Sequence, residues 1–141
     1  MKEFEDKEKR KLVIEKLKKF KKMNPWKGDV GERISKFNWL WEELVKIYNK
    51  EDWVLICSVP TQTKFWYSSE GSFVDADNKV VVLQGRLSVI TFLHEFAHIL
   101  GANQEEAVKW SNELFKEVFP EKWAKLKRVG DMMVKINEER G

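Results

Sequence analysis

The sequence predicts an α+β fold, in which a small, mostly antiparallel sheet packs against a motif-bearing helix, a backing helix and C-terminal helices. Apolar residues recur at helical spacing in the first third of the chain and again after residue 88. Between these parts, β-branched and apolar runs are separated by Gly, Pro and Asp, as in short strands and turns. We find no internal repeat and no low-complexity linker that would indicate a more complex organisation.

Size and composition indicate one globular domain. The chain has 141 residues, of which 35% are charged and 43% hydrophobic, with a formal net charge of +3, so a sizeable core is expected. No apolar run approaches the roughly 20 residues of a membrane span, and the charged N-terminus does not resemble a secretory signal. The single cysteine, Cys57, closes no internal disulfide, so we expect a buried apolar thiol in a cytoplasmic protein.

Residues 1–24 form a charged segment that we expect to be a surface helix, followed by a single domain over 25–141. Three roles stay open for this helix: packing on the domain, pairing with a second copy in a homodimer, or regulation by covering a cleft. Its run KLKKFKK is basic, but no glycine-rich or aromatic nucleic-acid motif accompanies it, so we expect neither nucleic acid nor a membrane as a partner. The narrow apolar stripe of the helix consists of Leu12, Val13, Leu17 and Phe20.

A second helix is expected over residues 32–49, followed by strands. Asp29 and Glu32 stand at capping-box spacing before its continuous apolar face. The apolar run at 53–60 predicts a strand, and TKFWYSS is a further candidate. An Asp-Ala-Asp-Asn turn predicts a hairpin with strands at 72–74 and 79–83.

Three helices are expected to close the chain. The first covers residues 88–100 and is ended by Gly101. Asn103 and Glu106, three residues apart, form a capping box for the second. The third is expected over 121–137. Its apolar side consists of Trp123, Leu126, Met133 and Ile136.

The stretch LSVITFLHEFAHILG, within the first of these helices, holds both histidines of the chain in H-E-x-x-H spacing. Thr91, His94, Glu95 and His98 fall on one stripe of the helix, and most other positions are apolar. Burying imidazoles and a carboxylate without partners is costly, and a metal ion is one partner that satisfies them. His94 and His98, one turn apart, can both direct a ring nitrogen at a cation about 2 Å away. A buried hydrogen-bonded cluster of these side chains is the alternative.

With this motif the sequence resembles the zincin metallopeptidases. A hairpin ending in KVVVLQG precedes the motif, as the active-site edge strand does in zincins. The segment EEAVKWSNELF is similar to the E-x-x-A-x-x-F-A-x-x-L-L helix of the ImmA/IrrE-type family, with Ala107, Trp110 and Ser111 at matching positions. The resemblance covers residues 83–120. It implies a gluzincin-like site in which two histidines and a glutamate bind zinc, in a family whose members act on or around repressors.

The third metal ligand is where this sequence departs from the family. Sites with three histidines are excluded, because the chain has only two. The family's glutamate usually lies three residues before the alanine, where this chain has Gln104. Glu106 lies at the edge of the Ala107 face on a helical wheel and is our preferred ligand, with ordinary helix capping as its other reading. The remaining candidates are Gln104, Glu105, Glu113 and Glu117.

We therefore expect zinc-dependent hydrolysis of a peptide bond in a protein substrate. Glu95 would act as general base on a zinc-bound water, and the substrate would lie along the edge strand. The alternative is a catalytically weak or inactive zincin-fold protein that binds a partner or a repressor. A peptidase also needs a group that stabilises the oxyanion, for which the candidates are Tyr48, Tyr67 and Arg86.

Overall fold

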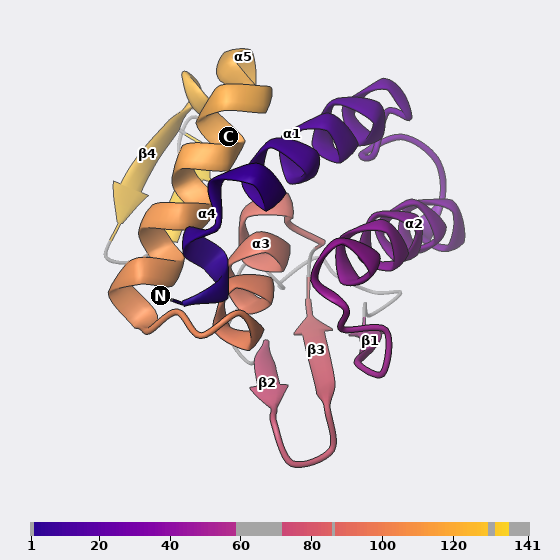
Figure 1. Ribbon diagram of the computed structural model, residues 1–141. Helices are drawn as coiled ribbons and strands as arrows, with labels where there is room; N and C mark the ends of the chain where they lie inside the picture. The colour runs from indigo at the N-terminus through magenta and orange to yellow at the C-terminus, as the bar shows by residue number, and fades with distance from the viewer. Residues whose placement is uncertain (1, 59–71, 86, 130–131, 136–141) are drawn as a thin grey trace.

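The computed structural model describes residues 2–58, 72–85, 87–129 and 132–135, and it has an α+β fold (Figure 1). Helix α3 packs against α4 and against the strands β2 and β3, and α1 packs against α2 and α4. The first half of the described chain holds the short 3-10 helix η1 (Glu3–Glu5), α1 (Lys7–Lys22), α2 (Val30–Tyr48), β1 (Val54–Ser58) and β2 (Phe73–Asp75). The second half holds β3 (Val80–Gln84), α3 (Val89–Ile99), α4 (Gln104–Val118), α5 (Pro120–Trp123), β4 (Leu126–Val129) and β5 (Met132–Lys135).

The N-terminal helix is part of the core. Val13, Leu17 and Phe20 of α1 are fully buried, whereas Leu12 is 45% exposed. The Phe20 ring meets Phe37 of α2 edge-on, with ring centroids 5.2 Å apart. Of the roles that the sequence left open for this stripe, packing on the domain is the one present in the structure.

Three of the predicted helix ends are confirmed by their backbone and cap geometry. The side chain of Asp29 accepts a hydrogen bond from the Glu32 N–H, and Glu32 returns one to the Asp29 N–H. Asn103 and Glu106 make the same reciprocal pair at the start of α4. Gly101 follows α3 with φ of +95°, a conformation that glycine adopts without strain.

The three-stranded sheet is mixed, so the predicted mostly antiparallel sheet is wrong in this respect. Its order is β1-β3-β2, with β3 parallel to β1 and antiparallel to β2. The tight turn of the β2–β3 hairpin places β2 on one side of β3, and β1 pairs with the other side in the same direction as β3. The strand that ends KVVVLQ is therefore the central one among the described strands, not the edge strand that we expected.

The predicted C-terminal helix over 121–137 is also wrong. Among the described residues of this range, the short α5 is the one helix, and β4 and β5 then pair in antiparallel fashion, with Leu126 opposite Lys135. The sequence explains this outcome, because Gly130 and Asp131 stand between the two strands. Gly in a helix interior costs about 1 kcal/mol relative to Ala, which weakens the predicted helix.

Other expectations have mixed outcomes. Cys57 is half-buried, with a thiol whose pKa is raised by desolvation to about 11.

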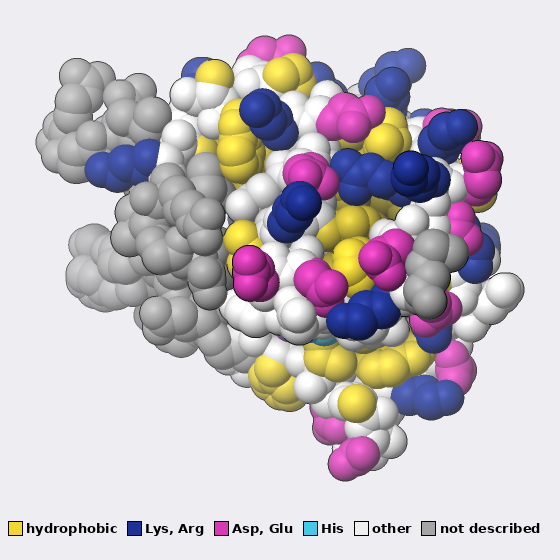
Figure 2. All heavy atoms as spheres, turned by 60° about the vertical axis from the view of Figure 1, so that its left-hand side comes forward, with side chains coloured by type: hydrophobic (Ala, Val, Ile, Leu, Met, Phe, Trp, Pro, Cys, Tyr) yellow, Lys and Arg dark blue, Asp and Glu magenta, His cyan; other side chains and the backbone are white. Residues whose placement is uncertain are grey.

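The candidate strand TKFWYSS and Ile136 lie outside the described residues. No helix in the described part of the chain combines the length and apolar character needed to cross a membrane. On the face shown in Figure 2, acidic and basic side chains are interspersed among apolar ones.

Candidate metal centre

Helix α3 holds the motif with both of its ends fixed. Ser88 caps the helix by accepting a hydrogen bond from the Thr91 N–H at 3.2 Å. Phe92 and Phe96 are buried on one side, and both meet the Trp41 ring edge-on, at centroid distances of 6.1 and 5.5 Å. Burial of each phenyl ring contributes about 1.5–3 kcal/mol. This packing fixes the rotation of α3 about its axis, and with it the direction of the polar stripe.

The two motif histidines face one another from successive turns of α3. Their Nε2 atoms lie 3.1 Å apart, and their rings are nearly perpendicular, at 85°, with centroids 4.7 Å apart. Both side chains are half-buried. Two nitrogens bound to one tetrahedral zinc at about 2.0–2.1 Å are separated by about 3.3 Å. The imidazoles therefore fit shared coordination of one small cation with little rearrangement.

The backbone after α3 orients one of these rings. Nδ1 of His98 lies 2.9 Å from the carbonyl oxygen of Ala102. A carbonyl only accepts hydrogen bonds, so Nδ1 carries the proton and donates it. In the neutral ring, Nε2 then keeps its lone pair, as a metal ligand requires. Sequence reasoning missed Ala102, although the glycine turn at the end of α3 was a signal that the chain reverses close to His98.

Glu95 is the buried acid of the motif. Its side chain is only 9% exposed, and the carboxylate makes no hydrogen bond within the described part of the chain. Desolvation raises its pKa to about 7, and the charge of the nearby His98 opposes that rise. The group therefore exchanges a proton near neutral pH, which suits acid–base chemistry.

Gln104, at the start of α4, is the residue that the structure brings to the histidines. Its Oε1 atom lies 3.1 Å from Nε2 of His94. This is the position where the ImmA/IrrE-type pattern has glutamate. An amide oxygen is a neutral metal donor, weaker for zinc than a carboxylate, and the side chain itself is exposed.

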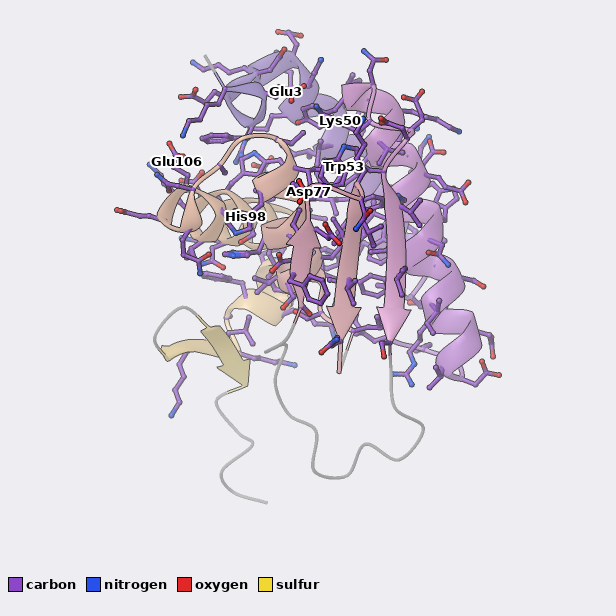
Figure 3. All side chains as sticks on the ribbon, turned by 90° about the horizontal axis from the view of Figure 1, so that it is seen from below. Glu3, Lys50, Trp53, Asp77, His98 and Glu106 are labelled. Atoms are coloured by element: carbon purple, nitrogen blue, oxygen red, sulfur yellow. The ribbon has the colours of Figure 1, made fainter. Side chains whose placement is uncertain are left out.

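Glu106 is hydrogen-bonded to partners other than the histidines. Its Oε1 accepts hydrogen bonds from the Asn103 N–H at 2.9 Å and from Lys2 Nζ at 2.8 Å. These two partners, the backbone one first, lower the pKa of the carboxyl group. Figure 3 labels Glu106 and His98 on the two neighbouring helices. Ligation by Glu106 thus remains a prediction, and it requires the cap and the ion pair to open.

The other candidates are not assembled around the histidines either. Glu113 lies 3.7 Å from Arg10 as an ion pair, and Glu105 and Glu117 are exposed. Among the described residues, no group of three or more His, Cys, Asp and Glu side chains is placed to hold a metal ion. The donors that converge are two imidazoles and one amide.

The oxyanion candidates receive no support from the described contacts. Tyr48 is 2% exposed, and its ring packs on Phe96, on the side of α3 away from the histidines. Burial raises the pKa of its hydroxyl group, which has no hydrogen-bond partner in the described part of the chain. Tyr67 and Arg86 lie outside the described residues.

The sequence matches no protein-family model, and neither a curated protein nor a solved structure shows significant similarity to it. The case for a function therefore depends on the geometry of α3 and its surroundings.

Proposed function

We propose that the chain is a zincin-like zinc metallopeptidase that hydrolyses a peptide bond in a protein substrate. The observation that carries the proposal is the pairing of His94 and His98, whose Nε2 atoms face each other at 3.1 Å. The hydrogen bond from His98 Nδ1 to Ala102 adds to it, because it leaves the other ring nitrogen available as a donor. The same 3.1 Å separation also suits a hydrogen bond between the two imidazoles, so a hydrogen-bonded cluster without metal is the alternative that zinc stoichiometry tests.

The residues divide the chemistry between them. His94 and His98 would hold the zinc ion, with an oxygen donor from α4 as third ligand. Bound zinc would supply a Lewis acid for the scissile carbonyl group and would lower the pKa of water toward neutrality. Glu95, next to His94 and shielded from solvent, takes the proton of the attacking water. It then delivers that proton to the leaving amine nitrogen as the C–N bond breaks.

One feature supports a second candidate function. The α4 side chain that contacts His94 is the neutral amide of Gln104, and the carboxylate of Glu106 is engaged by Asn103 and Lys2. A site with neutral donors binds zinc less tightly than one with a carboxylate. The same fold would then serve as a catalytically weak or inactive module that binds a partner or a repressor.

Zinc stoichiometry tests the proposal directly. Elemental mass spectrometry is run on purified wild-type protein, on His98→Ala and on Glu95→Gln, after equilibration with zinc. We expect about one zinc ion per chain in the wild type and in Glu95→Gln, and loss of zinc in His98→Ala. A wild type that stays free of zinc, or a His98→Ala variant that keeps it, would overturn the metal site.

Hydrolysis separates the enzyme from the binding module. The wild type and Glu95→Gln are each incubated, zinc-loaded, with a library of proteome-derived peptides, and new termini are identified by mass spectrometry. Cleavages made by the wild type and absent with Glu95→Gln support a peptidase. A zinc-bound wild type that makes no such cleavage supports the binding module instead.

A further inference from the structure

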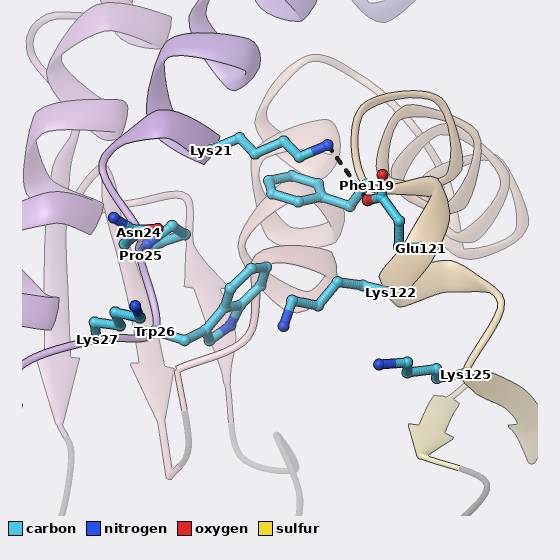
Figure 4. A pocket seen from close by; sticks show the side chains of 9 residues that line it. All are labelled: Lys21, Asn24, Pro25, Trp26, Lys27, Phe119, Glu121, Lys122 and Lys125. Atoms are coloured by element: carbon cyan, nitrogen blue, oxygen red, sulfur yellow. Dashed lines mark hydrogen bonds and ion pairs between the residues drawn. The ribbon is translucent and has the colours of Figure 1, made fainter.

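A concave site, apart from the histidines, lies between the end of α1, the loop before α2 and the segment 119–125 (Figure 4). The pocket encloses about 280 Å³. None of the histidine-site residues lines it. It is formed by Lys21, Asn24, Pro25, Trp26, Lys27, Phe119, Glu121, Lys122 and Lys125.

The pocket accounts for the excess positive charge of the chain. Four of the 26 Lys and Arg residues line the pocket, together with one of the 23 Asp and Glu residues. The rest of the chain then has 22 basic and 22 acidic residues, which balance. Within the pocket, Lys21 pairs with Glu121 at 3.4 Å and donates to the Val118 carbonyl at 3.0 Å. Lys27, Lys122 and Lys125 are exposed and contribute the surplus. A localised positive surplus of this kind attracts anions.

Trp26 gives the pocket an aromatic surface. It is 36% exposed, which is unusual for so large an apolar side chain, and its ring meets the buried Phe119 edge-on with centroids 5.3 Å apart. Lys122 Nζ lies over the indole, 4.6 Å from the ring centroid. The indole is therefore supported from the core and accessible from solvent.

The loop that carries Trp26 is held in one conformation. Nζ of Lys36 donates to the carbonyl oxygens of Asn24 and Lys27, both at 2.9 Å. Asn24 adopts a left-handed conformation with φ of +53°, and Gly28 has φ of +99°. A ligand that meets Trp26 thus finds it already placed, so little conformational entropy is lost on binding.

Against the sequence expectation that nucleic acid is not a partner, we propose that this pocket binds single-stranded nucleic acid through one nucleotide unit, with the base stacked on Trp26 and the phosphates at Lys27, Lys122 and Lys125. A phosphate group alone would be satisfied by the lysines and gives no reason for an exposed indole. Base stacking uses the indole, and it is stronger than the exposed cation–π contact of Lys122 that it displaces. The displaced ammonium group then meets an adjacent phosphate. The pocket shares no lining residue with the histidine site. Its lining comes from two segments that are far apart in the sequence, 21–27 and 119–125.

Fluorescence anisotropy of a labelled oligothymidylate at low salt tests the proposal, with the full chain free of zinc. We expect binding that weakens with salt, with a log–log slope of up to about −2 for three lysines. Trp26→Ala should lose roughly ten-fold or more in affinity, and Trp26→Phe should recover part of that loss. Lys122→Gln with Lys125→Gln should flatten the slope. A matched control pair, Lys11→Gln with Lys46→Gln, changes two exposed lysines outside the pocket and should leave it unchanged.

Several results would overturn the proposal, and one would change the identity of the ligand. Absence of binding at low salt overturns it, as does equal binding by duplex DNA, since a paired base offers no free face to Trp26. Loss of affinity in the control lysine pair equal to that in the pocket pair indicates diffuse charge attraction and also overturns it. Full competition by a free mononucleotide at similar affinity would show that the ligand is the nucleotide itself and not a strand. Melting curves of each variant identify any that fail to fold, and Trp26→Leu, which keeps apolar bulk without an aromatic ring, then replaces Trp26→Ala in the comparison.

Discussion

Oε1 of Gln104 lies 3.1 Å from Nε2 of His94, so a side chain from α4 reaches across to the first histidine of the motif on α3. The two residues are ten positions apart, and the turn through Gly101 and the Asn103 cap sets their approach. Because of this contact, a substitution of Gln104 by glutamate would change the charge beside His94 with little change in side-chain shape. Substitutions at position 104 and at Glu106 can therefore show by experiment which of the two residues is the third ligand.

Replacing Gln104 by Glu should tighten zinc binding. The two side chains have the same length, and the new carboxylate adds a charged oxygen donor beside His94. We expect the zinc dissociation constant to fall by roughly ten-fold or more, measured by competition with a chromophoric chelator. Asn112→Asp adds the same charge elsewhere on α4 and is the matched control. An equal gain in both variants would mean that only overall charge had acted, and no gain in Gln104→Glu would remove position 104 from the site.

Replacing Glu106 by Ala should lower stability, and its effect on zinc affinity decides whether Glu106 is the third ligand. The substitution removes the carboxylate that accepts hydrogen bonds from the Asn103 N–H and Lys2 Nζ. Loss of half a capping box and of an exposed ion pair should lower the free energy of unfolding, measured by urea denaturation. Glu105→Ala, the neighbouring exposed residue, is the control and should change stability by less than about 0.5 kcal/mol. A large loss of zinc affinity in Glu106→Ala alone would establish Glu106 as the third ligand.

The sequence predicted best what is determined locally. The caps at Asp29 and Asn103 depend on residues three positions apart, and the stripe of α3 depends on spacings of three and four, so both follow from the pattern. His94, Glu95 and His98 were identified for the same reason. Their surroundings were not, because the approach of Ala102 and Gln104 depends on how the chain turns between two helices.

Non-local features escaped prediction for physical reasons. Alternation along β1 and β3 shows that these are strands but does not encode whether they pair in the same direction. The apolar residues between 121 and 137 fit a helical period, yet one glycine between them weakens a helix. The cluster around Trp26 joins a loop near residue 25 to residues near 120, and neither segment alone carries a binding motif.

The thiol of Cys57 should react slowly at neutral pH. Burial raises the thiol pKa to about 11, because the thiolate is poorly solvated there. Only the thiolate is nucleophilic, so the rate of alkylation by iodoacetamide should rise about ten-fold per pH unit and level off near the raised pKa. In urea the same cysteine should show the ordinary pKa of about 8.5. A folded-state rate that levels off as early as the unfolded one would contradict the raised pKa.

The ion pair between Lys16 and Glu43 should make the α1–α2 contact sensitive to acid. Nζ of Lys16 lies 2.9 Å from Oε1 of Glu43, and this hydrogen bond is the main cause that lowers the pKa of the carboxyl group. A lowered folded-state pKa stabilises the protein at every pH above the unfolded value of about 4.3. The contribution is lost as pH falls through the folded-state pKa.

Glu43→Gln should therefore reduce the free energy of unfolding near neutral pH by up to about 1 kcal/mol, and the difference from wild type should shrink toward zero as the pH falls through the lowered folded-state pKa of this carboxyl group. Urea denaturation at neutral pH and at a series of acidic pH values measures this directly. Glu42→Gln makes the same chemical change at the adjacent exposed position of α2, where the side chain takes part in no ion pair with a described residue. If the two variants lose the same stability at neutral pH, or if the loss in Glu43→Gln persists in acid, then packing of the side chain and not its charge joins α1 to α2.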